Sequence, residues 1–226
     1  MAFGNGPRII TDGLVLSLDA ADRNSYVSGS TTWFDLSGNN YSGSLTNGPT
    51  FNSGSGGSIL FDGIDDFASL SGTINLGNTF TILSWIKPST LAGGDYIVYG
   101  TDANGSDNWF GINANSVNLF ATEIADANNF NITGGSITST DIWYFIGCTI
   151  NTSTAKVYLN GVEQNSTTKA FTIGSWNSAI NSIGRRGALA QRYFPGNIAN
   201  VQAYSRVLST TEMLINYNAQ KSRFGL

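Results

Sequence analysis

Three aspartates lie close together in the segment ILFDGIDDF, residues 59–67, between two short apolar runs. Carboxylates at this spacing are typical of a catalytic pair, a metal site or a turn between strands. Glycoside hydrolysis needs two opposed carboxylates, but no predicted strand of this chain carries alternating acids. Asp62, Asp65 and Asp66 instead end a strand, where aspartates favour a turn by accepting hydrogen bonds from nearby amides. We predict a turn here, no catalytic residue in the chain and therefore no enzyme.

A second oxygen-rich segment, TDANGSDNW at residues 101–109, has the composition of a calcium or sugar site. Its candidate ligands are Asp102, Asn104, Asp107 and Asn108. Calcium takes six to eight oxygens, whereas a sugar needs an aromatic face beside amides or carboxylates, which Trp109 and, in GSWNS, Trp176 would supply. The alternatives are a solvated hairpin loop for the segment and buried core positions for the tryptophans.

The composition excludes other kinds of function. The 226 residues include no histidine, so histidine-zinc sites and histidine-based catalytic triads are excluded. A net charge of −4 without a basic run gives little electrostatic basis for binding nucleic acid. No run is apolar enough to cross a bilayer, and the start lacks the pattern of a secretory signal. The single cysteine, Cys148, shares the alternating phase of Tyr144, Ile146 and Ile150, so we predict a buried apolar position without a disulfide.

Short apolar runs separated by turn clusters such as SGNN, SGSGG and NTST predict many strands. We expect them at residues 14–19, 58–62, 80–87, 95–101, 117–122, 143–150, 156–161 and 197–205. Asn160-Gly161 predicts a tight hairpin, because both residues accept the positive φ of a type I′ turn. Many strands without alternating helices indicate an all-β, antiparallel β-sandwich.

One short helix is predicted near the C-terminus. Ser209, followed three residues later by Glu212, fits a capping box, so we interpret Glu212 as a cap and not a catalyst. Met213, Leu214 and Tyr217 follow at helical spacing and are expected to lie on the sandwich. We expect a single domain over residues 13–226. Residues 1–12 are predicted to form an arm that reaches a neighbouring subunit, with a frayed terminus as the alternative.

Six segments, in order, resemble the laminin-G and pentraxin-like jelly rolls of the concanavalin A-like lectin and glucanase superfamily. They are GLVLSLDA, WFDLSGN, ILFDGIDDF, FTILSWIKP, WYFIGCTI with KVYLNG, and FPGNIANVQAYSRVLSTTEMLINY, and they span residues 13–217. The resemblance implies a concanavalin A-like jelly roll in which FDGxDD is a turn between neighbouring strands. It also implies that the last segment is the final strand followed by a short packed helix.

The chain departs from these relatives at their functional positions. Pentraxins bind calcium partly through an Asp-Asn pair, which Asp107-Asn108 matches, but their remaining ligands precede the final strand. There this chain carries Arg185, Arg186 and Arg192, which would repel a divalent cation. We therefore expect no metal site and no cofactor, with calcium the one ion left open. The acidic strand of the related glucanases has no counterpart here, which again argues against an enzyme.

The arginines allow three interpretations. They could pair with the chain's own aspartates, contact an acidic neighbouring subunit or bind an anionic glycan. Together with the oxygen-rich segment and the two tryptophans, they complete the predicted ligand-binding set. That set is Asp102, Asn104, Asp107, Asn108, Trp109, Trp176, Arg185 and Arg186.

The stretch from GLVLSLDA to ILFDGIDDF is similar to the version of this domain in structural proteins of tailed phages. This implies a non-enzymatic virion component, such as a capsid decoration or a tail or baseplate accessory, made in the host cytoplasm. It would self-associate and contact capsid or tail subunits, with no nucleic acid or membrane partner. The neutral surface expected from only 12% charged residues fits that role. The alternative is a carbohydrate-binding module for host-surface or extracellular polysaccharide, and the two roles are compatible.

Overall fold

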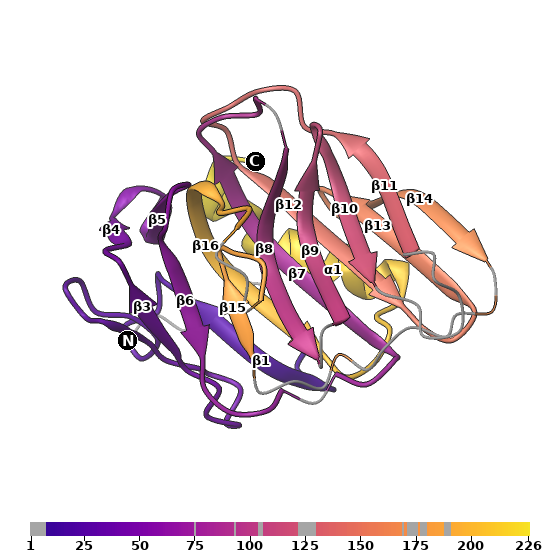
Figure 1. Ribbon diagram of the computed structural model, residues 1–226, viewed down its shortest axis with the longest axis horizontal. Coiled ribbons are helices and arrows are strands. Elements are labelled where there is room, and N and C mark those ends of the chain that lie inside the picture. The colour runs from indigo at the N-terminus through magenta and orange to yellow at the C-terminus, as the bar shows by residue number, and fades with distance from the viewer. Residues whose placement is uncertain are drawn as a thin grey trace.

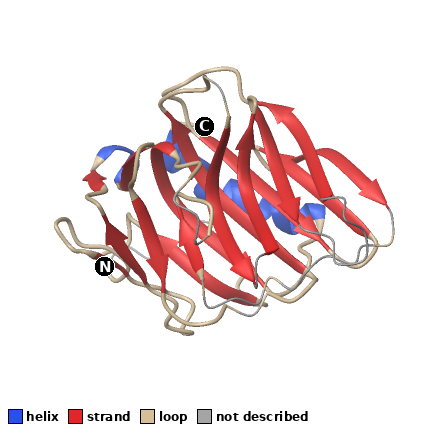
Figure 2. Ribbon diagram, viewed as in Figure 1, coloured by secondary structure: helices blue, strands red, loops and turns tan. Residues whose placement is uncertain are grey.

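The computed structural model describes residues 8–74, 76–92, 94–103, 106–121, 130–168, 170, 176, 180–187 and 191–226, with the backbone alone at 102, 103, 106 and 107. Within these residues, two antiparallel sheets of eight strands each pack face to face (Figure 1 and Figure 2). The predicted all-β sandwich is confirmed. No helix in the described ranges combines the length and apolarity needed to cross a bilayer.

Sheet A is the layer that also carries the C-terminal helix. In order across the sheet its strands are β14 (Val162–Thr168), β13 (Thr154–Leu159), β12 (Tyr144–Ile150), β7 (Phe80–Pro88), β16 (Pro195–Tyr204), β5 (Ser58–Asp62) and β4 (Thr50–Asn52), with β1 (Leu14–Asp19) also beside β16. A single 3-10 turn, η1 (Gly54–Gly56), joins β4 to β5.

Sheet B forms the opposite layer and faces the viewer in Figure 1. In order its strands are β11 (Phe130–Ser136), β10 (Ser116–Ala121), β9 (Ser106–Asn113), β8 (Asp95–Ala103), β15 (Asn181–Ile183), β6 (Phe67–Leu70), β3 (Gly43–Thr46) and β2 (Thr32–Trp33). Strand β9 corrects the prediction of a loop over residues 101–109, because residues 106–109 already pair with β8.

Strand β16 organises sheet A from its centre. One edge pairs with β7 along most of its length, while the other edge pairs first with β5 and then with β1. The register shifts between Ile198 and Asn200, where the Ala199 carbonyl oxygen accepts a hydrogen bond from the Ala20 amide at 3.0 Å. The Asn200 carboxamide oxygen accepts the Trp85 amide at 3.0 Å, so a side chain satisfies a donor that the bulge displaces.

The main core lies between the sheets. Side chains alternate across each strand, so every second residue of the central strands points inward, as Ile82 and Ile86 of β7 and Phe110 and Ile112 of β9 do. Cys148 belongs to this core with no exposed surface, which confirms the predicted buried position. Burial raises the pKa of its thiol well above the usual range, because a thiolate would lose its hydration there.

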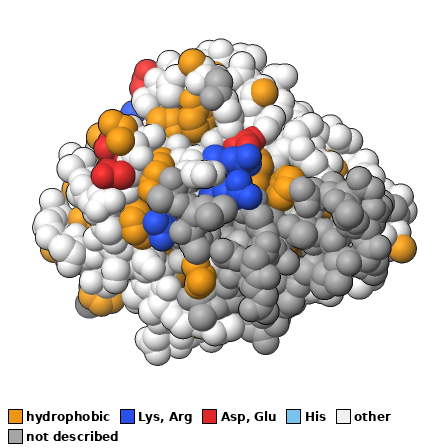
Figure 3. Space-filling view, viewed as in Figure 1, with side chains coloured by type: hydrophobic (Ala, Val, Ile, Leu, Met, Phe, Trp, Pro, Cys, Tyr) orange, Lys and Arg blue, Asp and Glu red, His pale blue; other side chains and the backbone are white. Residues whose placement is uncertain are grey.

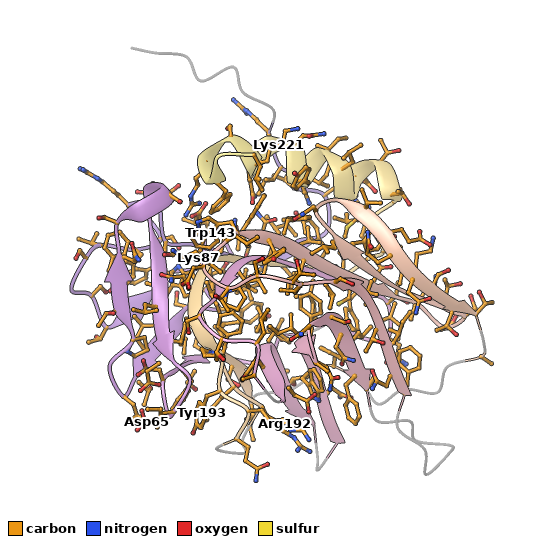
Figure 4. All side chains as sticks on the ribbon, turned by 90° about the horizontal axis from the view of Figure 1, so that it is seen from above. Asp65, Lys87, Trp143, Arg192, Tyr193 and Lys221 are labelled. Atoms are coloured by element: carbon orange, nitrogen blue, oxygen red, sulfur yellow. The ribbon has the colours of Figure 1, made fainter. Side chains whose placement is uncertain are left out.

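A second core lies on the outer face of sheet A. Helix α1 (Thr210–Gln220) and the 3-10 turn η2 (Lys221–Phe224) cover that face, on the side opposite sheet B (Figure 4). Trp85 of β7 points outward into this layer, where its ring stacks on Phe224 with a centroid distance of 4.1 Å and contacts Phe145 at 5.4 Å. Strand β7 is therefore buried on both faces, which explains its continuous apolar sequence.

The predicted capping box is present at the start of α1. The Glu212 amide donates to the Ser209 hydroxyl at 3.3 Å, and the Glu212 carboxylate accepts the Ser209 amide at 2.8 Å. A hydrogen bond from Arg206 at 2.7 Å, with smaller help from Ser209, holds the pKa of Glu212 at about 2. Glu212 is thus a cap, as predicted.

The face that α1 turns to sheet A differs from the prediction at one position. Met213 is buried and Tyr217 packs beside it, but Leu214 is 43% exposed. Asn216 takes the buried place, where its carboxamide oxygen accepts the Ile10 amide at 2.8 Å and its nitrogen donates to the Tyr204 hydroxyl at 3.1 Å. Through Asn216 the helix holds the segment that precedes β1. Helical spacing in the sequence does not predict this long-range contact.

The start of the chain is tied to the same layer. Burial raises the pKa of Tyr204 to about 12, so its hydroxyl keeps its proton and donates to the Ile10 carbonyl oxygen at 2.9 Å. Of the predicted arm, residues 1–7 lie outside the described part of the chain, and Ile10 packs against the second core.

Candidate functional site

The aspartates of ILFDGIDDF form the turn that the sequence predicts. The Asp62 carboxylate accepts hydrogen bonds from the amides of Ile64, Asp65 and Asp66 at 2.8, 3.2 and 3.3 Å, and the Asp66 carboxylate accepts the Asp62 amide at 3.0 Å. Partial desolvation opposes ionisation of Asp62, but these amide bonds together outweigh it and lower its pKa. Burial, helped by the two neighbouring carboxylates, raises the pKa of Asp66. The cluster therefore serves to close the connection between β5 and β6.

The described glutamates also have structural roles. Glu163 on β14 forms an ion pair with Lys156 on β13 at 2.8 Å, and Glu212 caps α1 while pairing with Arg206 at 2.7 Å. Glu123 lies outside the described residues. Among the acids that the structure describes, the turn aspartates are the one group of three whose oxygens approach within 4.8 Å of one another.

Of the four candidate oxygen ligands in the segment 101–109, the structure describes the side chain of Asn108. Asn108 has no exposed surface and shares the inward face of β9 with Phe110, opposite Thr101. This burial leaves the Asn108 carboxamide without surface for a ligand from solvent. The side chains of Asp102 and Asp107, and all of Asn104, lie outside the described residues.

The two predicted sugar-binding tryptophans are buried. Trp176 has no exposed surface and lies in the main core against Phe80, with ring centroids 4.5 Å apart. Trp109 points to the outer face of sheet B but is only 1% exposed, since its ring is stacked on Phe120 at 5.5 Å and covered by Arg192. A ring without free surface cannot stack on a pyranose. The prediction of buried positions therefore holds for both tryptophans, and the prediction that they bind a sugar is corrected.

An irregular stretch, the arginine segment, which we define as residues 184–187 and 191–194, lies over β8 on the outer face of sheet B. It bonds directly to β8, since the Gly184 amide donates to Val98 at 3.1 Å and the Ile97 amide donates to the Arg192 carbonyl oxygen at 3.2 Å. Gly100 permits the close approach, because a Cβ there would lie 2.4 Å from the Arg185 carbonyl oxygen. The arginine segment is thereby fixed on the sheet.

Three arginines gather on this face. Arg192 forms an ion pair with Asp95, whose other oxygen accepts a hydrogen bond from Asn113, and its guanidinium lies 5.8 Å from the Trp109 ring. The Arg185 guanidinium lies 3.5 Å from the centroid of the Phe67 ring. Pairing with the chain's own aspartates is thus confirmed for Arg192, while Arg185 contacts an aromatic ring instead.

The basic group is visible on the surface. Figure 3 shows Lys and Arg side chains gathered near the centre of this face, next to acidic atoms. Arg192 and its neighbour Tyr193 project from the side of the molecule opposite α1 (Figure 4). The Arg192 side chain is 36% exposed, and Tyr193 and Arg186 are half-buried. The sequence analysis did not single out Tyr193, which stands directly before the buried Phe194 and Pro195 in RYFPG.

Comparisons with known proteins agree with this architecture. A family model described as the concanavalin A-like lectin/glucanases superfamily matches residues 61–213. No curated protein matches the sequence. Among solved structures, the binding domain of botulinum neurotoxin serotype D has a TM-score of 0.71 and 17% identity over 93% of this chain, and that of Paraclostridial mosquitocidal protein 1 has 0.71 and 18% over 92%.

This chain spans about half the length of those toxin domains, 53% and 52% respectively. Domain 4 of AbnA, an extracellular arabinanase from Geobacillus stearothermophilus solved with arabinotriose, has a TM-score of 0.68 and 18% identity, and the match covers 92% of this chain and 98% of that domain. A further serotype D structure contains N-acetylneuraminic acid. At these identities the structural likeness establishes the fold, and these neighbours are binding domains. With the family match over most of its length, the chain belongs to the concanavalin A-like lectin/glucanases superfamily.

Proposed function

We propose that this protein is a non-enzymatic binding module that recognises glycans through the outer face of sheet B. The observation that carries the proposal is the arginine segment, whose residues Arg185, Arg186 and Arg192 lie over the outer face of sheet B, with the half-buried Tyr193 next to Arg192 (Figure 4). The neighbours solved with N-acetylneuraminic acid and with arabinotriose support a glycan as the ligand class.

The chemistry of this face suits acidic sugars. Guanidinium groups present several N–H donors in a plane and bind carboxylates in a bidentate manner. Asp95 and Phe67 hold two of the guanidinium groups in place, so little side-chain entropy remains to be lost on binding. Tyr193 adds an aromatic surface with a hydroxyl group that can contact a sugar ring.

The test is a glycan array with the whole chain, followed by titration of a sialylated oligosaccharide against wild type and the Arg186→Ala/Arg192→Ala double variant. We expect at least tenfold weaker binding in the variant, because each charge-assisted hydrogen bond contributes about 1.5–3 kcal/mol. Arg23→Ala is the matched control, since Arg23 is exposed away from this face. Wild-type affinity in the double variant, or an array without binding, contradicts the proposal.

A second candidate function is that of a virion structural protein, a capsid decoration or a tail or baseplate accessory. The sequence likeness to tailed-phage proteins supports it. Exposed apolar side chains on the loop after β2, which is held in place by hydrogen bonds, support it as well. There the Asp35 carboxylate accepts four hydrogen bonds, from the amides of Ser17, Ser37 and Tyr41 and from the Ser37 hydroxyl. The loop is thereby fixed while Phe34 and Leu36 stay 49% and 38% exposed, which suits docking onto a capsid, a tail subunit or a second copy.

This role is tested on particles. Cryo-electron microscopy of purified virions from an infected culture should show density for the fold at symmetric positions on the shell or tail, with the chain detected in the same fraction. A Phe34→Ala/Leu36→Ala variant should lose occupancy on the particle while keeping its fold. Recovery of the chain in the soluble lysate alone, with none on intact particles, rules the role out.

A further inference from the structure

We infer that the corner of the sandwich between β3 and β4 holds a binding site for a neutral sugar residue, separate from the arginine segment. The inference rests on the proposed glycan-binding function and adds a second ligand class to it. A cavity of about 370 Å³ opens where the edge of sheet A meets the edge of sheet B, within the usual range for small-ligand pockets. In Figure 1 this corner lies at the left, where β3 and β4 are labelled. We call it the corner pocket.

One wall of the corner pocket is a fixed aromatic surface. The free aromatic surface is that of Phe51, whose ring is stacked on the buried Tyr26 with centroids 5.4 Å apart and planes at 28°, and Leu45 extends the wall. The Tyr26 hydroxyl donates to the Ser30 carbonyl oxygen at 3.0 Å, which locks the ring. Phe51 is half-buried and keeps part of its surface free. An apolar wall that is already ordered matches the C–H face of a sugar ring at low entropic cost.

The rim of the corner pocket is polar and uncharged. The hydroxyls of Ser28, Thr31 and Thr50 lie at exposed positions around it. Hydroxyl groups both donate and accept hydrogen bonds, which is the pattern that sugar hydroxyls need. Among the described residues that line the pocket none is charged. An anionic sugar would lose hydration there without gaining an ion pair, which is unfavourable.

A second hollow adjoins the corner pocket across the turn between β3 and β4. It shares Gly48 and Thr50 with the pocket and is lined on its far side by Asn47, Asp62 and Asp66. Asp62 is exposed and its carboxylate can accept hydrogen bonds from sugar hydroxyls, whereas it repels an acidic sugar. Two adjoining hollows fit successive residues of one chain. We therefore assign a neutral oligosaccharide to this corner.

The test uses a panel of neutral oligosaccharides, with arabinotriose among them, and one sialylated oligosaccharide, titrated against the whole chain while backbone amide shifts are recorded. The key variant is Thr50→Trp, at an exposed position on the edge strand β4, where a large ring fills both hollows. Thr168→Trp is the matched control, because Thr168 is exposed on β14, the opposite edge strand of the same sheet.

We expect neutral binding to weaken at least tenfold in Thr50→Trp and to stay unchanged in Thr168→Trp, with shifts at Thr31, Gly48 and Phe51 when the neutral probe is added. Binding of the sialylated probe should not change in either variant. Neutral binding that survives Thr50→Trp, or a panel in which only the acidic probe binds, overturns this inference and leaves the proposed function standing. A panel without any binding overturns both.

Discussion

The two outer faces of the sandwich are both covered, but by different means. On sheet A, α1 and η2 add an apolar layer in which Trp85 stacks on Phe224. On sheet B, the arginine segment lies on the strands through backbone hydrogen bonds and leaves guanidinium groups at the surface. The helical layer removes apolar surface from water, whereas the arginine segment leaves positive charge at the surface. We therefore expect the helix side to contribute to stability through apolar packing, and the proposed recognition chemistry to lie on the other side.

The sharpest test of this contrast is Trp85→Ala. Loss of a fully buried indole should lower the free energy of unfolding by about 3–5 kcal/mol. Because the ring contacts η2, amide hydrogen exchange in α1 should accelerate as well. Trp109→Ala, also buried, is the matched variant and should leave exchange in α1 unchanged. Equal acceleration of α1 in both variants would break the contrast between the faces.

Gly100→Ala tests the cover of sheet B. The new methyl group would collide with the Arg185 carbonyl oxygen at 2.4 Å and the Gly187 nitrogen at 2.6 Å, so the arginine segment must shift. We expect a cost of about 1–3 kcal/mol in chemical denaturation. The hydrogen bond from the Ile97 amide to Arg192 should weaken, which amide exchange at Ile97 reports. Wild-type stability and exchange would mean that the segment is not pressed against β8.

Ser209→Ala tests how much of the helix side depends on local capping. Removing the hydroxyl that accepts the Glu212 amide should cost about 1 kcal/mol. Thr211→Ala, at an exposed position inside α1, is the control and should be neutral or slightly stabilising because alanine is the better helix former. If both variants behave alike, packing on sheet A alone positions the helix.

The last test concerns the response to acid. The pKa of Glu212 is about 2 in the folded protein against 4.5 ordinarily, so ionised Glu212 contributes stability that is fully present above pH 4.5 and is lost as the pH falls towards 2. Glu212→Gln should therefore show a shallower loss of stability over this window in denaturation at a series of pH values. Asp12→Asn, which alters a more exposed partner of Arg206, is the comparison. Parallel curves for wild type and Glu212→Gln would refute the assignment.

Much of the fold follows from local patterns. The eight predicted strands correspond to β1, β5, β7, β8, β10, β12, β13 and β16, because each is long or strongly apolar. The hairpin at Asn160-Gly161 has φ values of 51° and 79°, as its turn chemistry requires. Strands such as β2, β3 and β15 escape prediction because they have two to four residues rich in Ser, Thr and Gly, and pairing within the sheet is what orders them.

The site was harder to predict for a physical reason. The sequence near Trp109 suggests an exposed ring beside polar groups, but exposure is decided by Arg192, far along the chain. Likewise, Tyr26 and Phe51 meet only because the two sheets converge at one corner. Burial on an outer face depends on which distant segment crosses it, and no local pattern carries that information.

The position of β16 has a consequence for biosynthesis. Residues 195–204 supply the middle of sheet A and pair with β7, β5 and β1, all made much earlier on the ribosome. Until they emerge, three strands have no partner along one edge, so the domain can close only after residues 195–204 have been synthesised. Such long-range pairing is slow and leaves unpaired edges open to other chains. A fragment that stops before Pro195 should aggregate instead of folding. High expression rates should also favour aggregation of the whole chain.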